Sequence, residues 1–372
     1  MNLFLDVFAE TGLAHLTVGH PIMWLIGLAL VYLAIARKYE PYLLLPIGFG
    51  TILVNMPLSG LLDEHGLIRI FYYGIQYEVL PPLIFLGLGA MTDFSPVLAN
   101  KKTFLLGLGA QVGVFVAFGG AMLLGFTAQE AASIGIIGGA DGPTTIYVTN
   151  ALAPDMIGAT AVSAYAYMAL VPIIIPPIVR LLTKESERTI RMKQLRPVSK
   201  LEKILFPIIA TFVICLLIPA ATTLMGMFMI GNLFRESGVV KRLAEGAQNE
   251  LMNIVTILLG LSISMKLTAE SFLQWQVVMV FMLGLAAFAC SVAGGVLLAK
   301  LMNWFLPVDK VINPMIGAAG LSAVPMAARV VQEMGMKECR TNYLLMHAMG
   351  PNVAGVIGTV IAAGLFIAFL GG

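Results

Sequence analysis

Long runs of apolar residues, separated by short polar stretches, limit this chain to a small set of folds. The runs lie near 21–36, 42–62, 76–92, 104–126, 157–182, 204–231, 247–265, 277–302 and 344–370. A helix needs about 20 apolar residues to cross a hydrocarbon core about 30 Å thick. Only 11% of the residues are charged, against about 25% in soluble domains. We therefore expect an all-α polytopic membrane protein, which excludes ordinary soluble enzymes and proteins that bind nucleic acid.

Two further apolar segments, 130–150 and 312–330, are interrupted by Gly, Pro and polar residues. They bring the expected number of membrane segments to about eleven, two of them discontinuous. One hydrophilic linker, 184–203, carries seven basic and three acidic residues. Because basic loops stay in the cytoplasm, we expect the linker to be cytoplasmic. The number of segments then places the N-terminus on the same side as the linker and the C-terminus outside.

The two halves of the chain are related in sequence. The stretch 64–78 recurs as 236–250, with Glu, Gly and Gln residues at matching places, and both broken segments contain the pattern G-x-x-G-x-x-x-x-P. Matches that follow the same order along both halves indicate a duplication. With the first helix set aside, each half has five segments, and an odd number turns the second copy upside down in the membrane. The expected organisation is an N-terminal segment with the first membrane helix (1–41), a first inverted repeat (42–183), the basic linker (184–203) and a second inverted repeat (204–372).

The first broken segment contains an acidic residue at its break. Its sequence GIIGGADGPTTIY (135–147) combines glycines, which permit positive φ, with Pro143, which removes a backbone donor. The backbone is expected to unwind there and to expose carbonyl oxygens. Asp141 lies at the break, although a carboxylate at the bilayer centre costs about 2.5–3.5 kcal/mol. Two compatible interpretations are a cation ligand and a cap for the next helix.

The second broken segment offers neutral oxygen atoms. Asn313 carries an amide, Ser322 carries a hydroxyl, and Gly317 permits a close approach of two backbones. Hard cations prefer neutral and anionic oxygen ligands. We therefore expect Asp141, Asn313 and Ser322 to form a Na⁺ site together with carbonyl oxygens of both breaks. The alternative for Asn313 and Ser322 is hydrogen bonding between helices.

Three other positions each have two interpretations. Arg329 follows Ser322 by about two helical turns and is suited to binding a substrate carboxylate, but snorkelling to the interface or pairing with the acidic residue of the first break also explains it. Tyr165 and Tyr167 lie early in their span, where tyrosines are usually interfacial, and Tyr167 is also a candidate cation ligand or proton donor. His347 is either functional or a membrane histidine held by hydrogen bonds.

Several stretches of the chain closely resemble one family, the β subunits of the sodium-pumping biotin-dependent decarboxylases. The resemblance runs from about residue 35 to the C-terminus. It rests on GIIGGADGPTTIY (135–147), AYAYMALVP (164–172), GNLFRESGVV (231–240), INPMIGAAGLSAVPMAARV (312–330) and LLMHAMGPNVAGVIG (344–358).

The resemblance implies a function, cofactors and partners. In this family a soluble carboxyltransferase moves a carboxyl group from oxaloacetate, methylmalonyl-CoA, glutaconyl-CoA or malonate systems onto biotin, which a carrier subunit or domain holds. The β subunit decarboxylates carboxybiotin and couples this step to Na⁺ export, with a proton consumed. The implied cofactors are transported Na⁺ and biotin carried covalently on a partner. The implied partners are biotin-carrier and carboxyltransferase subunits, a small membrane-anchoring subunit and further copies of this chain, in the inner (cytoplasmic) membrane of a prokaryote.

The resemblance also assigns the candidate site. By position, the implied Na⁺ ligands are Asp141, Asn313 and Ser322, the implied catalytic residues are Arg329, Tyr167 and Ser322, and the implied carboxybiotin-binding residues are Arg329 and Gly317. The short segment between the second and third spans favours the acyl-CoA decarboxylases over the oxaloacetate type. The main alternative function is a sodium-coupled symporter or exchanger on the same inverted-repeat plan, without a biotin partner.

Overall fold

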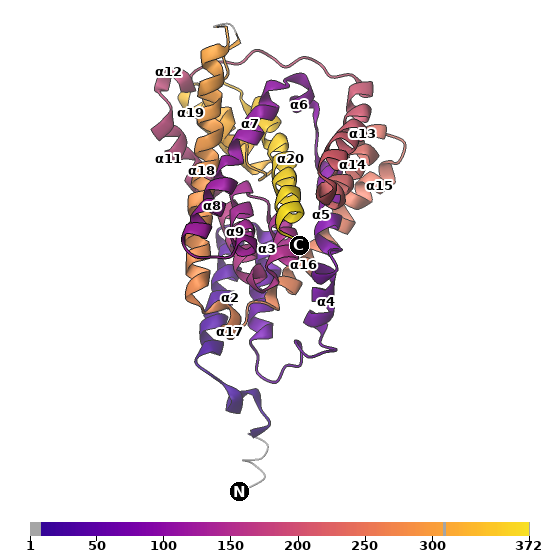
Figure 1. The fold of residues 1–372 in the computed structure, drawn as a ribbon, viewed down its shortest axis with the longest axis vertical. Helices are drawn as coiled ribbons and strands as arrows, with labels where there is room; N and C mark the ends of the chain where they lie inside the picture. Colours follow the sequence, from indigo (N-terminus) through magenta and orange to yellow (C-terminus); the bar gives the residue numbers. More distant parts are fainter. Residues whose placement is uncertain (1–8, 308–309, 372) are drawn as a thin grey trace.

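The computed structural model describes residues 9–307 and 310–371, and that part is helical, without strands. Helix accounts for 78% of the chain, and many of the helices run along the long axis of the molecule (Figure 1). The expected all-α architecture is therefore confirmed. Residues 1–8 of the predicted N-terminal segment lie outside the described residues.

Among the described residues, four helical stretches are long and apolar enough to cross a membrane, which agrees with a membrane protein. They are α2 (Gly19–Ala36), the consecutive α7 (Lys102–Ala110) and α8 (Val112–Leu123), α18 (Trp275–Phe305) and α20 (Leu345–Leu370). The number rises to six if each of two bent pairs is one span. The first pair is α4 (Leu67–Gln76) with α5 (Leu80–Met91), at 69°, and the second is Pro154–Met168 with Leu170–Leu182, at 64°, which together contain α11 (Ile157–Leu182). The shorter elements include η1 (Gly12–His15), α3 (Pro41–Val54), α6 (Ser95–Ala99), η3 (Pro154–Met156), α12 (Glu185–Arg188), α15 (Lys241–Gly246), the π turn η5 (Ala247–Leu251), α16 (Met252–Ser264) and α17 (Ala269–Phe272).

The apolar run 204–231 is not the single span that its composition predicts. It is divided between α13 (Lys200–Leu217) and α14 (Thr222–Ser237), which pack against each other on either side of the short η4 (Pro219–Ala221). Pro219 disfavours helical geometry at the residue before it, and Ile218 has φ −134° and ψ 81°. The proline therefore turns a continuous apolar run into a helical hairpin.

Glycines bring helices from the two halves of the chain into close contact. A Cβ at Gly89 of α5 would overlap the carbonyl oxygen of Phe228 on α14. A Cβ at Gly231 of α14 would likewise overlap the carbonyl oxygen of Leu86 on α5. Such small residues let membrane helices approach closely. The halves therefore interlock and do not form two separate bodies.

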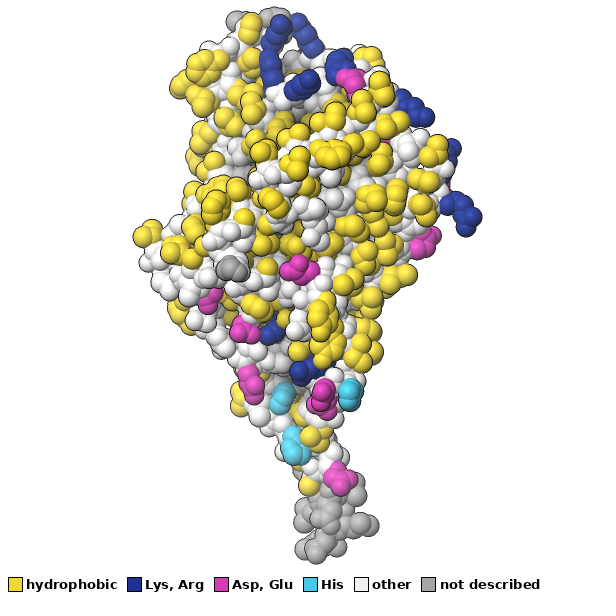
Figure 2. Space-filling view, turned by 45° about the vertical axis from the view of Figure 1, so that its right-hand side comes forward, with side chains coloured by type: hydrophobic (Ala, Val, Ile, Leu, Met, Phe, Trp, Pro, Cys, Tyr) yellow, Lys and Arg dark blue, Asp and Glu magenta, His cyan; other side chains and the backbone are white. Residues whose placement is uncertain are grey.

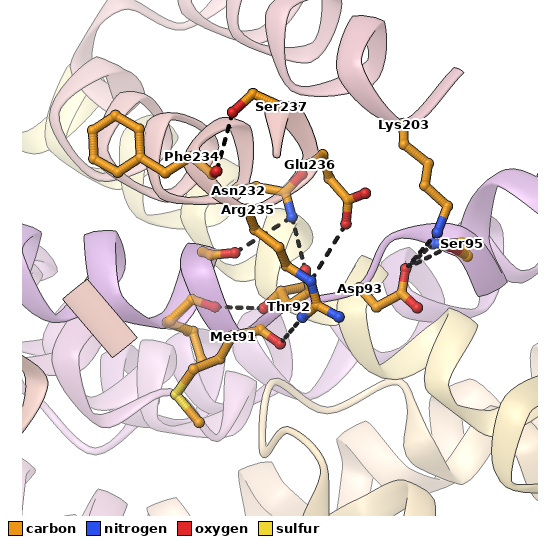
Figure 3. Close-up of polar contacts among 12 residues, drawn as sticks. Met91, Thr92, Asp93, Ser95, Lys203, Asn232, Phe234, Arg235, Glu236 and Ser237 are labelled. Carbon is orange, nitrogen blue, oxygen red and sulfur yellow. Dashed lines mark hydrogen bonds and ion pairs between the residues drawn. The ribbon is translucent and has the colours of Figure 1, made fainter. Parts of the chain in front are cut away.

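Polar contacts hold the α5–α14 pair at the end nearer the linker (Figure 3). Asn232 donates to the carbonyl oxygen of Thr92 at 2.7 Å, and Arg235 donates to a carbonyl oxygen at the end of α5. Asp93 faces Lys203 in the first turn of α13, with 3.9 Å between Nζ and Oδ1. These contacts join α13 and α14 to the first half of the chain.

The basic linker crosses the upper end of the molecule between α12 and α13, whereas η1 and the start of α2, the first described elements, lie at the lower end (Figure 1). On the face drawn in Figure 2, Lys and Arg side chains gather towards the upper end, and Asp, Glu and His predominate at the lower end. The expectation that the N-terminus and the linker share one side is therefore wrong. At least one of the six segments counted before the linker does not cross the molecule.

Candidate functional site

The first break separates two short helices and places Asp141 at the start of the second. The first is α9 (Ala128–Gly135), which continues as the 3₁₀ turn η2 (Ile136–Gly139), and the second is α10 (Gly142–Leu152). Between them Ala140 has a φ of 55°, a left-handed conformation that non-glycine residues seldom adopt. Asp141 Oδ1 accepts a hydrogen bond from the Thr144 backbone N–H at 3.0 Å. The interpretation of Asp141 as a helix cap is confirmed, and its Oδ2 remains available for another contact.

The second broken segment enters from the linker end and returns to it. It consists of the 3₁₀ helix η7 (Pro314–Ala319), an irregular stretch 320–325 and α19 (Met326–Glu338). At its start Asn313 donates to the Arg188 carbonyl oxygen in the linker at 2.9 Å. At its end Glu338 forms an ion pair with the Arg188 side chain at 3.0 Å, and Asn342 donates to the same carbonyl at 3.2 Å. The segment 313–338 is therefore a re-entrant hairpin in this structure, and the expectation of a broken crossing is wrong here.

The two breaks meet at one buried contact. Ser322 donates its hydroxyl hydrogen to Asp141 Oδ2 at 2.8 Å, and its backbone N–H donates to the Gly139 carbonyl oxygen at 2.9 Å. Asp141 is 4% exposed and Ser322 is 6% exposed. The carboxylate and hydroxyl that the sequence analysis assigned to one site therefore do come together.

Three oxygen atoms that the sequence analysis did not select surround this contact. Asn352 on α20 donates to the carbonyl oxygens of Leu321 and Ala323, which flank Ser322, and its own Oδ1 is buried without a partner in the described part of the chain. The hydroxyls of Thr144 and Tyr165 are also buried without a hydrogen-bond partner in the described part of the chain. The Tyr165 ring lies against Gly142, next to Asp141. The motifs 135–147, 164–172 and 344–358 contain these residues, but their polar atoms could not be placed without the fold.

The composition of this region suits a hard monovalent cation. Buried oxygen atoms without partners are unusual in folded proteins, and oxygen atoms are the ligands that hard cations prefer. The described residues contain no group of three or more His, Cys, Asp or Glu side chains that could hold a metal ion. A cation here would be bound by one carboxylate and several neutral oxygens.

Asn313 and Gly317 lie elsewhere than the sequence analysis expected. Asn313 uses its amide nitrogen on the linker and its Oδ1 to accept from the Met315 backbone N–H at 3.0 Å. It caps η7 at the linker end, so its side chain does not join the Asp141–Ser322 contact in this structure. Gly317 does allow two backbones to meet, but its neighbour is Gly295 of α18 and not the first broken segment.

Tyr167 and Arg329 also point away from the contact. Tyr167 is buried and its hydroxyl donates to the carbonyl oxygen of Phe281 on α18, so it is not an interfacial residue. Arg329 is exposed, and its guanidinium has no partner among the residues that the structure describes. The expected alignment of Arg329 with Ser322 assumed a continuous helix, but α19 begins only at Met326. The ion pair of Arg329 with Asp141 is likewise absent from the described contacts.

Comparisons with known proteins agree over the full length. Residues 19–370 match the family described as Na⁺-transporting oxaloacetate decarboxylase beta subunit. The chain is 57% identical to methylmalonyl-CoA decarboxylase subunit beta of Veillonella parvula, over 98% of this chain and 97% of that protein. It is 54% identical to glutaconyl-CoA decarboxylase subunit beta of Acidaminococcus fermentans, over 99% and 97%. It is 47% identical to the oxaloacetate decarboxylase beta chain of Haemophilus ducreyi, over 100% and 99%.

Proposed function

The chain belongs to the family of Na⁺-transporting oxaloacetate decarboxylase beta subunits, and from this premise we propose how its two broken segments bind and move Na⁺. It is a β subunit of a sodium-pumping decarboxylase, a membrane protein of bacterial type. Such a subunit decarboxylates carboxybiotin on a partner and couples the reaction to Na⁺ export, with a proton consumed. The alternative of a sodium-coupled symporter or exchanger without a biotin partner finds no support among these relatives.

One observation carries the proposal: the contact between Ser322 and Asp141 joins the two breaks. Sites at paired interruptions of membrane segments are typical of transporters. We assign Na⁺, the transported substrate, to this place. Its proposed ligands are Asp141 and Ser322, with the unpartnered oxygens of Thr144, Tyr165 and Asn352 as further candidates.

The other site residues receive roles that fit their surroundings. Arg329, exposed and without a partner in the described chain, is proposed to bind the carboxylate of carboxybiotin, because guanidinium groups bind carboxylates in bidentate fashion. Asn313 and Gly317 are proposed to position the hairpin, through the linker and through α18, and so to act on Na⁺ and carboxybiotin indirectly.

The chemical step needs a proton and supplies energy for transport. The bond between the biotin ureido nitrogen and the carboxyl carbon breaks, CO₂ leaves, and a proton binds to the nitrogen. Ser322 is the proposed relay for this proton, because the Tyr167 hydroxyl is occupied by the Phe281 carbonyl. Moving one positive charge against 100 mV requires about 2.3 kcal/mol, which decarboxylation has to provide.

We propose that the chain consists of two inverted repeats, from α2 to α11 and from α13 to α20. Equivalent helices then have equal lengths, 18 residues for α2 and α13 and 26 residues for α11 and α20. The packing supports the same correspondence, in which α3 is equivalent to α14 and α5 to α16. The pair α3–α16 and the pair α5–α14 both pack together, as two such repeats related by symmetry would. This division keeps the linker 184–203 between the repeats. It differs from the expected division into 1–41, 42–183 and 204–372 in one respect, because the first membrane helix now belongs to the first repeat.

The substrate of the complex is proposed to be an acyl-CoA. The alignment with the oxaloacetate-type relative extends over 433 positions, whereas those with the methylmalonyl-CoA and glutaconyl-CoA relatives named above take 365 and 367. The longer alignment includes residues that this chain lacks. The proposed partners are a biotin carrier, a carboxyltransferase and a small membrane-anchoring subunit, and the proposed setting is an oligomer of this chain in the inner membrane.

Replacing Asp141 tests the site. We expect D141N to abolish both Na⁺-dependent decarboxylation and Na⁺ uptake when the complete complex is reconstituted into vesicles, because an amide lacks the charge that binds the cation. D155N is the matched control, since Asp155 is exposed and paired with Lys266 in a different place. If D141N retains both activities, the proposed Na⁺ site is wrong.

A further inference from the structure

A basic cavity lies under the linker, outside the Asp141–Ser322 contact. It has a volume of about 790 Å³, and its polar lining includes Arg191, Arg196, Lys203, Gln332, Asn342 and His347. A second cavity of about 470 Å³ shares linker residues and His347 with the first, so the two adjoin on either side of the linker. Neither is lined by Asp or Glu among the described residues. The lining therefore favours an anionic ligand.

Arg191 is the cation of this lining that is free to bind such a ligand. Arg196 already pairs with Glu202 at 2.6 Å, and Lys203 faces Asp93. Arg191 is exposed, and within the described chain its guanidinium donates only to the Cys339 sulfur at 3.5 Å. An exposed guanidinium beside a thiol and without a carboxylate partner can bind an incoming carboxylate without breaking an ion pair.

His347 supplies an independent sign of a ligand. It is 7% exposed and lines both cavities, yet its Nδ1 has no hydrogen-bond partner in the described structure. Buried polar atoms normally have partners. Gln332 adds a donor beside it, because its Oε1 accepts from the backbone N–H groups of Leu344 and Leu345 and leaves its NH₂ group to bind a carbonyl.

We propose that this cavity is the docking site where the carboxylated biotin of the partner subunit first binds, with Arg191 and His347 holding its carboxylate before it passes to Arg329 for decarboxylation; the inference rests on the proposed function. The amide of Gln332 suits the ureido carbonyl. Pro96, Leu195 and Met346 provide an apolar surface for the sulfur ring and the aliphatic arm. The volume lies within the roughly 300–1,000 Å³ of sites for small organic ligands.

The fold connects this cavity to the Na⁺ site through α20. His347 lies in the first turn of that helix, and Asn352 follows it by about 7–8 Å along the axis. Asn352 holds the two carbonyl groups that flank Ser322. A ligand bound against His347 therefore rests on the helix that holds the second break, which gives the two sites a direct structural connection.

The first test measures how turnover depends on the concentration of the carboxylated biotin carrier, with the reconstituted β chain. We expect R191Q to raise the KM for the carrier about tenfold, because it removes one charge-assisted hydrogen bond. The kcat should change less, and the half-saturating Na⁺ concentration should stay the same. The control is K337Q, which removes an exposed charge at the same end and does not line either cavity. Equal KM values for R191Q and K337Q, with normal Na⁺-dependent turnover, would overturn the inference alone. Absence of Na⁺-dependent turnover in the unmodified complex would overturn the proposed function and the inference with it.

The second test does not depend on activity. Cys339 contacts Arg191 and Thr341, which both line the larger cavity, so a bound biotin head is expected to slow its alkylation. In a chain with C215S and C290S, we expect the biotinylated carrier to slow the labelling of Cys339 several-fold, and the same carrier without biotin to have no effect. Equal protection by both carriers, or by neither, would contradict docking at this cavity.

Discussion

Asp141 is tolerated in an apolar protein because its two oxygens have separate partners. The Thr144 backbone N–H and the Ser322 hydroxyl each donate to it. Hydrogen bonds to charged groups contribute about 1.5–3 kcal/mol each, which together offset an insertion cost of about 2.5–3.5 kcal/mol. The site therefore does not need a bound cation to stay folded, as a pump that empties its site in every cycle requires.

Cys339 is expected to react unusually fast for a cysteine. Hydrogen bonds from Thr341, and then from Arg191, lower the pKa of its thiol to about 7, against about 8.5 for a free cysteine. Because the thiolate is the nucleophile, the alkylation rate should reach half its maximum near pH 7. T341V should move this midpoint upwards, since it removes the largest contribution. The measurement is the pH profile of labelling in the C215S/C290S background, and a midpoint at or above 8.5 in the unmodified site would contradict the prediction.

At the scale of residues, chemistry alone identified the pair that meets. A carboxylate at a Gly-Pro break is rare enough to indicate Asp141, and the repeat indicated Ser322 opposite to it. Arg329 was misplaced because its position was extrapolated along a helix that the 320–325 stretch interrupts. Asn352 was not selected because a buried asparagine inside a helix has no local sequence signal and acts only through the carbonyls that the fold brings to it.

At the scale of elements, the hairpin of η7 and α19 depends on one crossing with α18. A Cβ at Gly317 would overlap the Gly295 carbonyl, and forcing atoms into a packed interface usually costs about 1–3 kcal/mol. We expect G317A to lower the melting temperature of the detergent-solubilised protein by several degrees. The control is G226A on α14, where a Cβ meets no atom within 4 Å and alanine favours the helix by up to about 1 kcal/mol. Equal melting temperatures for the two variants would show that the crossing does not need glycine.

Most long helices could be predicted from apolar length, but the turns between them could not. The run 157–182 and α11 have the same bounds, and 344–370 and α20 differ by one residue. The turn at Pro219 within the run 204–231 could not be predicted, because both arms of that hairpin are apolar. Hydropathy does not show whether the chain continues across the membrane or turns back. For the same reason a segment that crosses and a segment that returns have the same composition.

At the scale of the whole molecule, the contact of Asp93 with α13 and α14 joins the two halves and should respond to acid. Burial raises the pKa of Asp93, but hydrogen bonds from Ser95 and the nearby Lys203 and Arg235 outweigh it and lower the pKa below its usual value. A lowered pKa stabilises the fold above the unfolded value of about 3.9, and this contribution is lost as pH falls through the folded value. D93N should therefore lower the melting temperature at pH 7, and its difference from the unmodified chain should shrink below about pH 4. A difference that does not change with pH would contradict this origin.

The opposite placement of η1 and the linker predicts which loops can be labelled from each side of the membrane. His65 and Ser186 are exposed and lie in the 55–66 loop and near the start of the linker, respectively. In a chain without native cysteines, H65C should react with an impermeant maleimide in intact cells, and S186C should react only in inverted vesicles. Basic loops stay in the cytoplasm, which fixes the direction. Labelling of both positions from one side would contradict the inverted arrangement.

Arg188 touches both arms of the re-entrant hairpin, through the ion pair to Glu338 and through its carbonyl to Asn313 and Asn342. If the hairpin moves relative to the linker, it must either break these three contacts together or move the linker with it. The linker residues that line the basic cavity would then move as well. Arg188 therefore joins both ends of the hairpin to the linker. The chain connection between the halves therefore also limits how far the hairpin, which carries Ser322, can move away from Asp141.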